Sequence, residues 1–237
     1  ESCLKGYRKI KDTEGEAFTL WALAGALRIK GDLKGAVKCF KESFRLFKAI
    51  RDRSGVGYCL TGLGGASRVA GRVEDSYRYY IEANALFRGL KDRFGVAYSY
   101  CGIANALRMR GDFKVALKYF KKAKDNYKKI GDIVSSAYTL WAEGSSYQSL
   151  GKDKSALRDF KEARRYFEKT GDRRGLIYCD ISEGQIEFKK DAKKGLRLIR
   201  RALKDSERCG FKVENDYAKQ VLNAALKNPS GLPLNVA

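Results

Sequence analysis

Residues 93–132 read RFGVAYSYCGIANALRMRGDFKVALKYFKKAKDNYKKIGD, and the pattern of this 40-residue stretch recurs on both sides of it. Three sets of residues repeat at steps of 40: glycines, aspartates and aromatic residues. The glycines are Gly31, Gly71, Gly111 and Gly151, the aspartates are Asp12, Asp52, Asp92, Asp132 and Asp172, and the aromatics are Phe18, Tyr58, Tyr98, Tyr138 and Tyr178. Three series with one period indicate an internal repeat.

Each repeat is predicted to form two helices. The first begins at an Asp-x-x-Gly turn, where the aspartate can cap the helix, and ends at the repeated glycine, which suits a left-handed C-terminal cap. The second follows about two residues later and carries apolar residues at helical spacing, such as Val37, Phe40, Phe44 and Phe47. We therefore expect an all-α protein.

The repeats resemble the tetratricopeptide repeat, in which large, small and aromatic residues stand at fixed offsets. One repeat supplies Leu140, Gly144, Tyr147, Gly151, Ala156, Phe160 and Ala163, and the preceding one supplies Tyr100, Ile103, Ala104, Leu107, Gly111, Ala116, Phe120 and Ala123. The resemblance is to the forty-residue type and covers about residues 13–210. It implies a right-handed α-solenoid of about five helix-turn-helix repeats, with small residues such as Ala36 and Ala116 where paired helices cross.

The pattern predicts the following organisation. Residues 1–12 form part of a second helix from a truncated preceding repeat, or alternatively an isolated capping helix. Five repeats cover residues 13–52, 53–92, 93–132, 133–172 and 173–210, the last fitting only if one residue is removed near Asp191. Residues 211–227 form a capping helix that covers the end of the array. Residues 228–237 form a tail, whose apolar end (231–237) could lie in the groove of a neighbouring molecule.

Composition restricts the function. The chain has 237 residues, no histidine and a net charge of +21, from 49 Lys and Arg against 28 Asp and Glu. Without histidine there is no Ser-His or Cys-His relay and no histidine metal site. The six cysteines form no C-x-x-C pair, so we expect reduced thiols and a cytoplasmic location. No apolar run is long enough to span a membrane. We expect no enzyme activity, no cofactor and no metal.

In tetratricopeptide proteins the first helices line a concave groove, and the resemblance places a set of side chains there. The predicted groove residues are Phe18, Trp21, Arg28, Tyr58, Arg68, Tyr98, Asn105, Arg108, Tyr138, Trp141, Gln148 and Tyr178. The aromatic series fits packing between helices as well as it fits ligand binding. The repetition of Arg28, Arg68 and Arg108 favours binding, because a guanidinium group offers a planar fork to a carboxylate or phosphate.

These patterns predict a protein-interaction scaffold that binds an extended, acidic peptide in its groove. The alternative is binding of nucleic acid, RNA or single-stranded, through the basic surface and the groove tyrosines. Self-association through the exposed repeat end or the tail is a further expectation. Glu143, Glu183 and Glu187 stand where the repeat favours apolar residues, and we expect groove arginines or Lys189 to pair with them.

Overall fold

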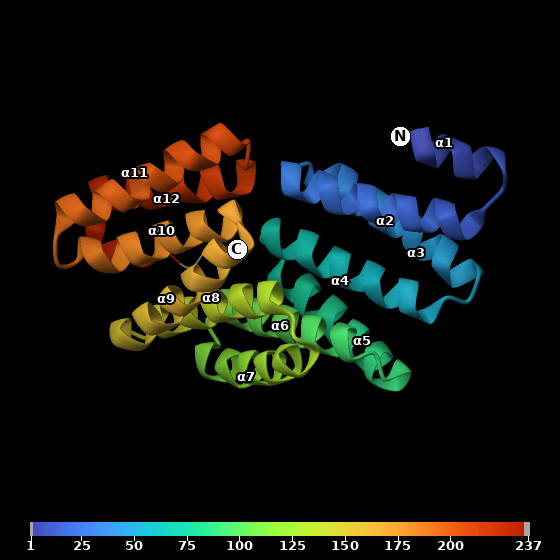
Figure 1. Cartoon of the computed structure of the whole chain (residues 1–237), viewed down its shortest axis with the longest axis horizontal. Helices are drawn as coiled ribbons and strands as arrows, with labels where there is room; N and C mark the ends of the chain where they lie inside the picture. Colours follow the sequence, from blue (N-terminus) through green and yellow to red (C-terminus); the bar gives the residue numbers. More distant parts are fainter. Residues whose placement is uncertain (1, 235–237) are drawn as a thin grey trace. The chain divides into compact units, whose positions relative to one another are not determined.

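The structure is a computed structural model that describes residues 2–234, and the described part is built from α-helices (Figure 1). The helices are α1 (Ser2–Lys9), α2 (Thr13–Lys30), α3 (Leu33–Ala49), α4 (Arg53–Val69), α5 (Val73–Leu90), α6 (Arg93–Arg110), α7 (Phe113–Ile130), α8 (Ile133–Ser149), α9 (Asp153–Thr170), α10 (Arg173–Phe188), α11 (Ala192–Cys209) and α12 (Lys212–Lys227), followed by a 3-10 turn, η1 (Pro229–Gly231). Within the described residues there is no β-strand. The all-α expectation is confirmed.

The helix ends follow the predicted caps. The carboxylate of each repeated aspartate accepts a hydrogen bond of 2.8–3.0 Å from the backbone N–H three residues later. The repeated glycines have positive φ, for example 84° at Gly31 and 94° at Gly111. A left-handed residue at the end of a helix turns the chain back, and glycine takes this conformation without a steric cost.

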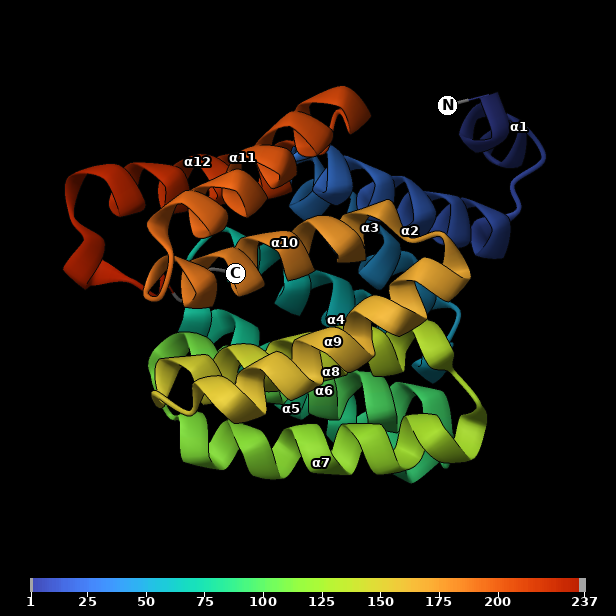
Figure 2. The same ribbon diagram turned by 60° about the vertical axis from the view of Figure 1, so that its left-hand side comes forward.

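The described chain forms two units, residues 2–106 and residues 107–234. In the first unit, α2 packs on α3, α3 on α4 and α4 on α5, while the first helices α2 and α4 also touch. In the second unit the same scheme joins α7 through α12, with α10 touching both α8 and α12. Figures 1 and 2 both show α11 lying against α10 and α12. Successive helix pairs thus stack within each unit, as in an α-solenoid.

Small residues let the paired helices come close. Ala36 and Ala116 are fully buried, as predicted. Gly102 in α6 faces the ring of Tyr80 in α5, and a Cβ at Gly102 would lie 2.1 Å from that ring. The bulky ring on one helix therefore fills the space that a missing side chain leaves on the next.

The fifth helix pair departs from the regular repeat. Helix α10 ends at Phe188, and α11 begins after the cap Asp191, whose carboxylate accepts from the Lys194 N–H at 3.1 Å. Gly195 lies so close to the backbone of Phe188 that a Cβ there would be 2.5 Å away. The shorter first helix and this close approach coincide with the irregularity near Asp191 in the sequence. None of the described helices combines the length and the apolar character needed to cross a bilayer.

Candidate functional site

An aromatic pocket lies on the first helices of the first unit. Phe18 and Trp21 of α2 stand with ring centroids 5.7 Å apart, and Trp21 meets Tyr58 of α4 edge-on at 6.3 Å. Phe18 is 60% exposed. The pocket has a volume of about 490 Å³ and includes the carboxylates of Asp12, Glu14 and Asp52 in its lining. Its rings offer an apolar wall for one ligand side chain.

Two arginines of this unit, Arg28 and Arg68, lie near the Tyr80 hydroxyl. Arg28 of α2 reaches α4 where Gly65 has no side chain: a Cβ at Gly65 would lie 3.8 Å from Arg28 Nη1 and 3.3 Å from the Tyr80 hydroxyl oxygen. Burial raises the pKa of the Tyr80 phenol, and the positive charges of Arg68 and Arg28 oppose this rise. Both arginines are half-buried, and neither forms an ion pair with an acid among the described residues. Two guanidinium groups thus lie near one phenol without an acidic partner.

Two tyrosines of the repeated aromatic series, Tyr58 and Tyr138, contact the next repeat through their hydroxyl groups. Tyr58 donates to Asp92 at 2.9 Å, and Tyr138 donates to Asp172 at 2.9 Å. Burial is the main cause that raises the pKa of both phenols. The acceptors are the carboxylates that cap the next first helix, so these tyrosines join successive repeats.

Two further predicted residues lie in α6. Tyr98 is half-buried and stacks on Phe94, with ring centroids 6.1 Å apart and an interplanar angle of 11°. The Asn105 amide donates to the Cys101 carbonyl of its own helix at 3.0 Å. Tyr98 therefore presents part of a stacked pair.

In the second unit, four of the five predicted groove residues are buried, and Tyr138 is half-buried. Arg108 is 1% exposed and lies over the Trp141 ring at 5.7 Å, and Trp141, itself 6% exposed, donates to the Ser182 hydroxyl at 2.9 Å. The Gln148 amide donates to the Ser182 carbonyl at 3.3 Å. Tyr178 packs 4.5 Å from Trp141 and donates to Glu214 at 2.8 Å. The predicted groove set is therefore divided between accessible residues in the first unit and packed residues in the second.

The end of the described chain makes a contact that the repeat pattern did not indicate. The Leu234 N–H donates to the Gln185 side-chain oxygen at 2.8 Å, and the Tyr217 hydroxyl lies 3.5 Å from the Leu234 carbonyl. The tail was expected in the groove of a neighbouring molecule, whereas residues 232–234 lie against their own chain. The last three residues of the expected tail lie outside the described residues. One feature of the sequence could have indicated that Gln185 binds a peptide backbone. Gln185 occupies the same position in its repeat as Asn105, which was predicted to lie in the groove.

The expected partners of Glu143, Glu183 and Glu187 were wrong, and of the three acids only Glu143 is buried. Glu143 contacts Lys124, Glu183 pairs with Arg164 at 2.9 Å, and Glu187 pairs with Lys194 at 2.7 Å. All three bases come from second helices. Lys124 and Arg164 lie on the second helix that precedes the acid's helix, and Lys194 lies on the one that follows it, because each first helix packs against both neighbours. Lys189 pairs instead with Asp153 at 3.2 Å.

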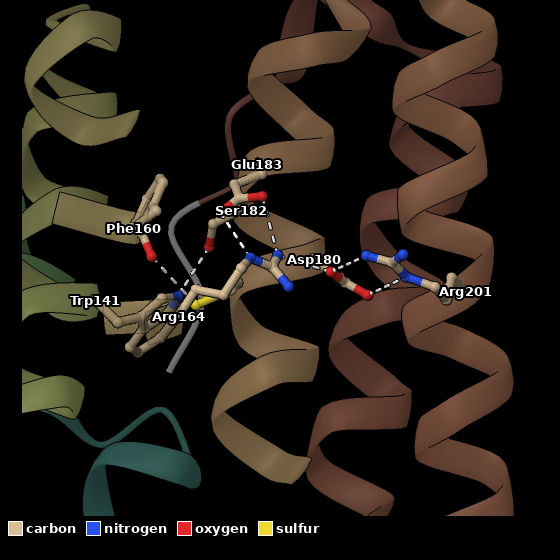
Figure 3. A network of polar contacts seen from close by, with 8 residues as sticks. Trp141, Phe160, Arg164, Asp180, Ser182, Glu183 and Arg201 are labelled. Carbon is tan, nitrogen blue, oxygen red and sulfur yellow. Dashed lines mark hydrogen bonds and ion pairs between the residues drawn. The ribbon is translucent and has the colours of Figure 1, made fainter. Parts of the chain in front are cut away.

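A four-residue network joins three helices of the second unit (Figure 3). Asp180 of α10 accepts from Arg164 of α9 at 2.8 Å and from Arg201 of α11 at 2.5 and 2.6 Å, while Arg164 also holds Glu183. These carboxylates are saturated by guanidinium groups, which suits a structural clamp. Among the described residues, no group of three or more acids and cysteines could hold a metal ion.

A family model for the tetratricopeptide repeat matches residues 58–129. Residues 58–129 of this chain therefore carry tetratricopeptide repeats. No curated protein sequence shows significant similarity to it. Solved structures of similar fold include the aspartyl phosphate phosphatase F from Bacillus subtilis, with a TM-score of 0.70 and 14% identity over 98% of this chain and 65% of that chain.

Two further structures resemble these tetratricopeptide repeats. The apo form of RapI has a TM-score of 0.69 and 13% identity, covering 96% of this chain and 89% of that chain. A Rap protein complexed with Competence and Sporulation Factor has a TM-score of 0.65 and 12% identity, covering 94% of this chain and 65% of that chain. This chain therefore spans 65% of the length of two of the three relatives. At such identities the similarity shows a common fold.

Proposed function

We propose that this chain is a non-enzymatic protein-interaction scaffold whose first unit binds an extended, acidic peptide. The observation that carries the proposal is the pair Arg28 and Arg68, which lie near the Tyr80 hydroxyl and have no acidic partner among the described residues. Elsewhere in the described chain, arginines such as Arg164 and Arg174 are held by carboxylates. A half-buried guanidinium without a partner is a favourable place for a ligand carboxylate, because the bond formed is charge-assisted.

The aromatic pocket adds an anchor for the same ligand. Phe18, Trp21 and Tyr58 can cover an apolar side chain of the peptide, while Arg28 and Arg68 hold acidic residues farther along it. Aromatic anchors and arginines are the residue types that dominate binding energy at many interfaces. The acids in the lining of the pocket disfavour a ligand carboxylate there, so the peptide's acidic residues belong at the arginines.

The similar structures support a binding role only at the level of the fold. One of them is a Rap protein in complex with Competence and Sporulation Factor. Another is named a phosphatase, but the carboxylates that acid-base chemistry would use in this chain, such as those of Glu143 and Glu183, are held by Lys124 and Arg164. We therefore keep the proposal of a scaffold. The six cysteines are free thiols, which supports a cytoplasmic location.

The test is peptide binding measured by fluorescence anisotropy. A labelled pool of short peptides that mix Asp and Glu with Leu and Phe is compared with a pool in which Lys replaces the acids. Arg28→Ala combined with Arg68→Ala removes two charge-assisted contacts, and we expect a loss of about 2 kcal/mol, roughly thirty-fold in Kd. The matched control is Arg45→Ala with Lys48→Ala, which removes the same charge from exposed positions of α3.

Equal weakening by the two double variants would refute the arginine site, because the effect would then follow net charge alone. Nucleic acid is the other partner class, supported by the net charge of +21 and by the accessible Phe94–Tyr98 stack. A labelled single-stranded RNA measured in parallel separates the two. Tighter RNA binding that the acidic peptides do not displace would replace the peptide proposal by the nucleic-acid one.

A further inference from the structure

The segment after α12, residues 229–234, turns back onto the second unit. Helix α12 ends at Lys227 and η1 packs against it. Residues 232–234 then continue as half-buried chain to Gln185 in α10 and Tyr217 in α12. We call residues 229–234 the tail segment.

Gln185 and Tyr217 meet both main-chain polar groups of one residue, Leu234. The Gln185 side-chain oxygen accepts from the Leu234 N–H at 2.8 Å, and the Gln185 amide nitrogen donates to the Tyr217 hydroxyl at 3.3 Å. The Tyr217 hydroxyl in turn lies 3.5 Å from the Leu234 carbonyl oxygen. Leu234, Gln185 and Tyr217 thus form a closed ring of polar contacts. The tail segment contributes only main-chain atoms to this ring.

Both side chains are built into the core. Gln185 is fully buried and Tyr217 is 4% exposed. A buried amide is costly unless its hydrogen bonds are made, and here the Leu234 N–H is the donor that satisfies the Gln185 oxygen. The surrounding tail, from Gly231 through Leu234, carries no charge. This chemistry fits an extended, uncharged segment that is recognised through its backbone.

We propose that Gln185 and Tyr217 form a peptide site that reads main-chain groups, and that the tail segment is its intramolecular ligand. A partner with an extended, uncharged segment enters this site only when the tail segment leaves. The inference goes beyond the acidic-peptide function, because it concerns the second unit and does not depend on Arg28 or Arg68. The tail segment then acts as a built-in competitor.

The size of this competition follows from effective concentration. A short tether holds its ligand at an effective concentration on the order of millimolar. If the free segment binds with a Kd of about 100 µM, the tethered copy occupies the site about ten times as often as not, and binding of an added peptide weakens about ten-fold.

The experiment uses a labelled synthetic peptide with the sequence of residues 229–237 as the probe. It is titrated by anisotropy against the full chain, against a chain that ends at Asn228, and against full-length Leu234→Pro, which removes the N–H that Gln185 accepts. Leu226→Ala, at an exposed position of α12, is the matched control. Circular dichroism checks that each variant is folded, and the Leu234→Pro chain carries the test where the shortened chain does not fold.

The proposal predicts that the opened chains bind the probe about ten-fold more tightly than the full chain and the Leu226→Ala control. In the opened background, Gln185→Ala should abolish binding and Tyr217→Phe should weaken it. The proposal is overturned when the full and opened chains bind the probe equally, when the opened chains do not bind it, or when Gln185→Ala has no effect. Arg28→Ala with Arg68→Ala should leave this binding unchanged, so failure here is distinguishable from failure of the acidic-peptide site.

Discussion

Replacing Asp180 by alanine tests whether the network of Figure 3 holds the last helix pairs together. Asp180 is 4% exposed, and its carboxylate accepts hydrogen bonds from two arginines on two other helices. The substitution removes the only residue of the network that contacts both Arg164 and Arg201. After the change, Arg164 keeps its bond to Glu183 at 2.9 Å, while Arg201 loses both contacts to Asp180.

The expected loss can be derived from these contacts. Breaking a buried ion pair by removing one partner costs about 3–5 kcal/mol, mainly because the other charge stays buried. The cost is lower here, since the Arg201 side chain is 53% exposed and can be hydrated, and Arg164 retains a carboxylate. We therefore expect Asp180→Ala to lower the free energy of unfolding by about 3 kcal/mol.

Urea denaturation followed by circular dichroism measures this loss. The matched control is Asp205→Ala on α11, which removes a carboxylate from an exposed pair with Arg208 and should cost less than about 1 kcal/mol. Arg201→Ala should cost less than Asp180→Ala, and the double variant should show a coupling of about 1 kcal/mol. A loss below about 1 kcal/mol for Asp180→Ala, or equal losses at Asp180 and Asp205, would show that the network contributes little to stability.

Three further predictions concern local chemistry. Lys91 ends α5 in the left-handed conformation, with φ of 57°, which strains a residue that has a side chain. Lys91→Gly should therefore raise the free energy of unfolding by about 0.5–1 kcal/mol, measured by urea denaturation. A lower free energy of unfolding would contradict this expectation. Burial raises the pKa of the Cys59 thiol to about 11. At pH 8 a thiol reagent should therefore label the exposed Cys3 and leave Cys59 unmodified until the chain unfolds. Equal labelling rates at Cys3 and Cys59 would be inconsistent with this burial. Burial also raises the pKa of Glu143, despite the opposing effect of Lys124, so the folded state binds this proton more readily than the unfolded chain does. Glu143 therefore adds stability as the pH falls toward the ordinary range of a carboxyl group. Glu143→Gln should lessen this gain, and an unchanged dependence of the free energy of unfolding on pH would contradict it.

The fold could be predicted because its signals are local. The aspartate caps, the left-handed glycines and the alanines at helix crossings each depend on a few neighbouring residues, and each recurs with the 40-residue period. The ion-pair partners could not be predicted in this way, because they depend on distances between helices. Lys124 and Glu143 are 19 residues apart, as are Arg164 and Glu183, and this repeated spacing was the one signal that could have revealed the pairing.

The accessibility of the groove residues could not be predicted from a repeat pattern. Trp21 and Trp141 occupy the same place in their repeats, yet Trp21 is half-buried and Trp141 is buried. The difference arises from other repeats: Arg108 covers the Trp141 ring, and Tyr178 packs 4.5 Å from it, whereas Tyr58 lies 6.3 Å from Trp21. Periodicity assigns a residue to a face, but its neighbours decide whether a ligand can reach it.

The two units use the same face of the repeat in different ways. In the first, Arg28 and Arg68 lack acidic partners among the described residues, and the pocket beside Phe18 is open. In the second, aromatic and amide groups satisfy one another, and the amide of Gln185 is satisfied by the chain's own backbone at Leu234. A buried polar group that needs a main-chain donor selects an extended peptide whatever its side chains, whereas unpaired guanidinium groups select for charge. Under the two proposals, the first unit discriminates between partners by charge, and the second holds a segment by its backbone.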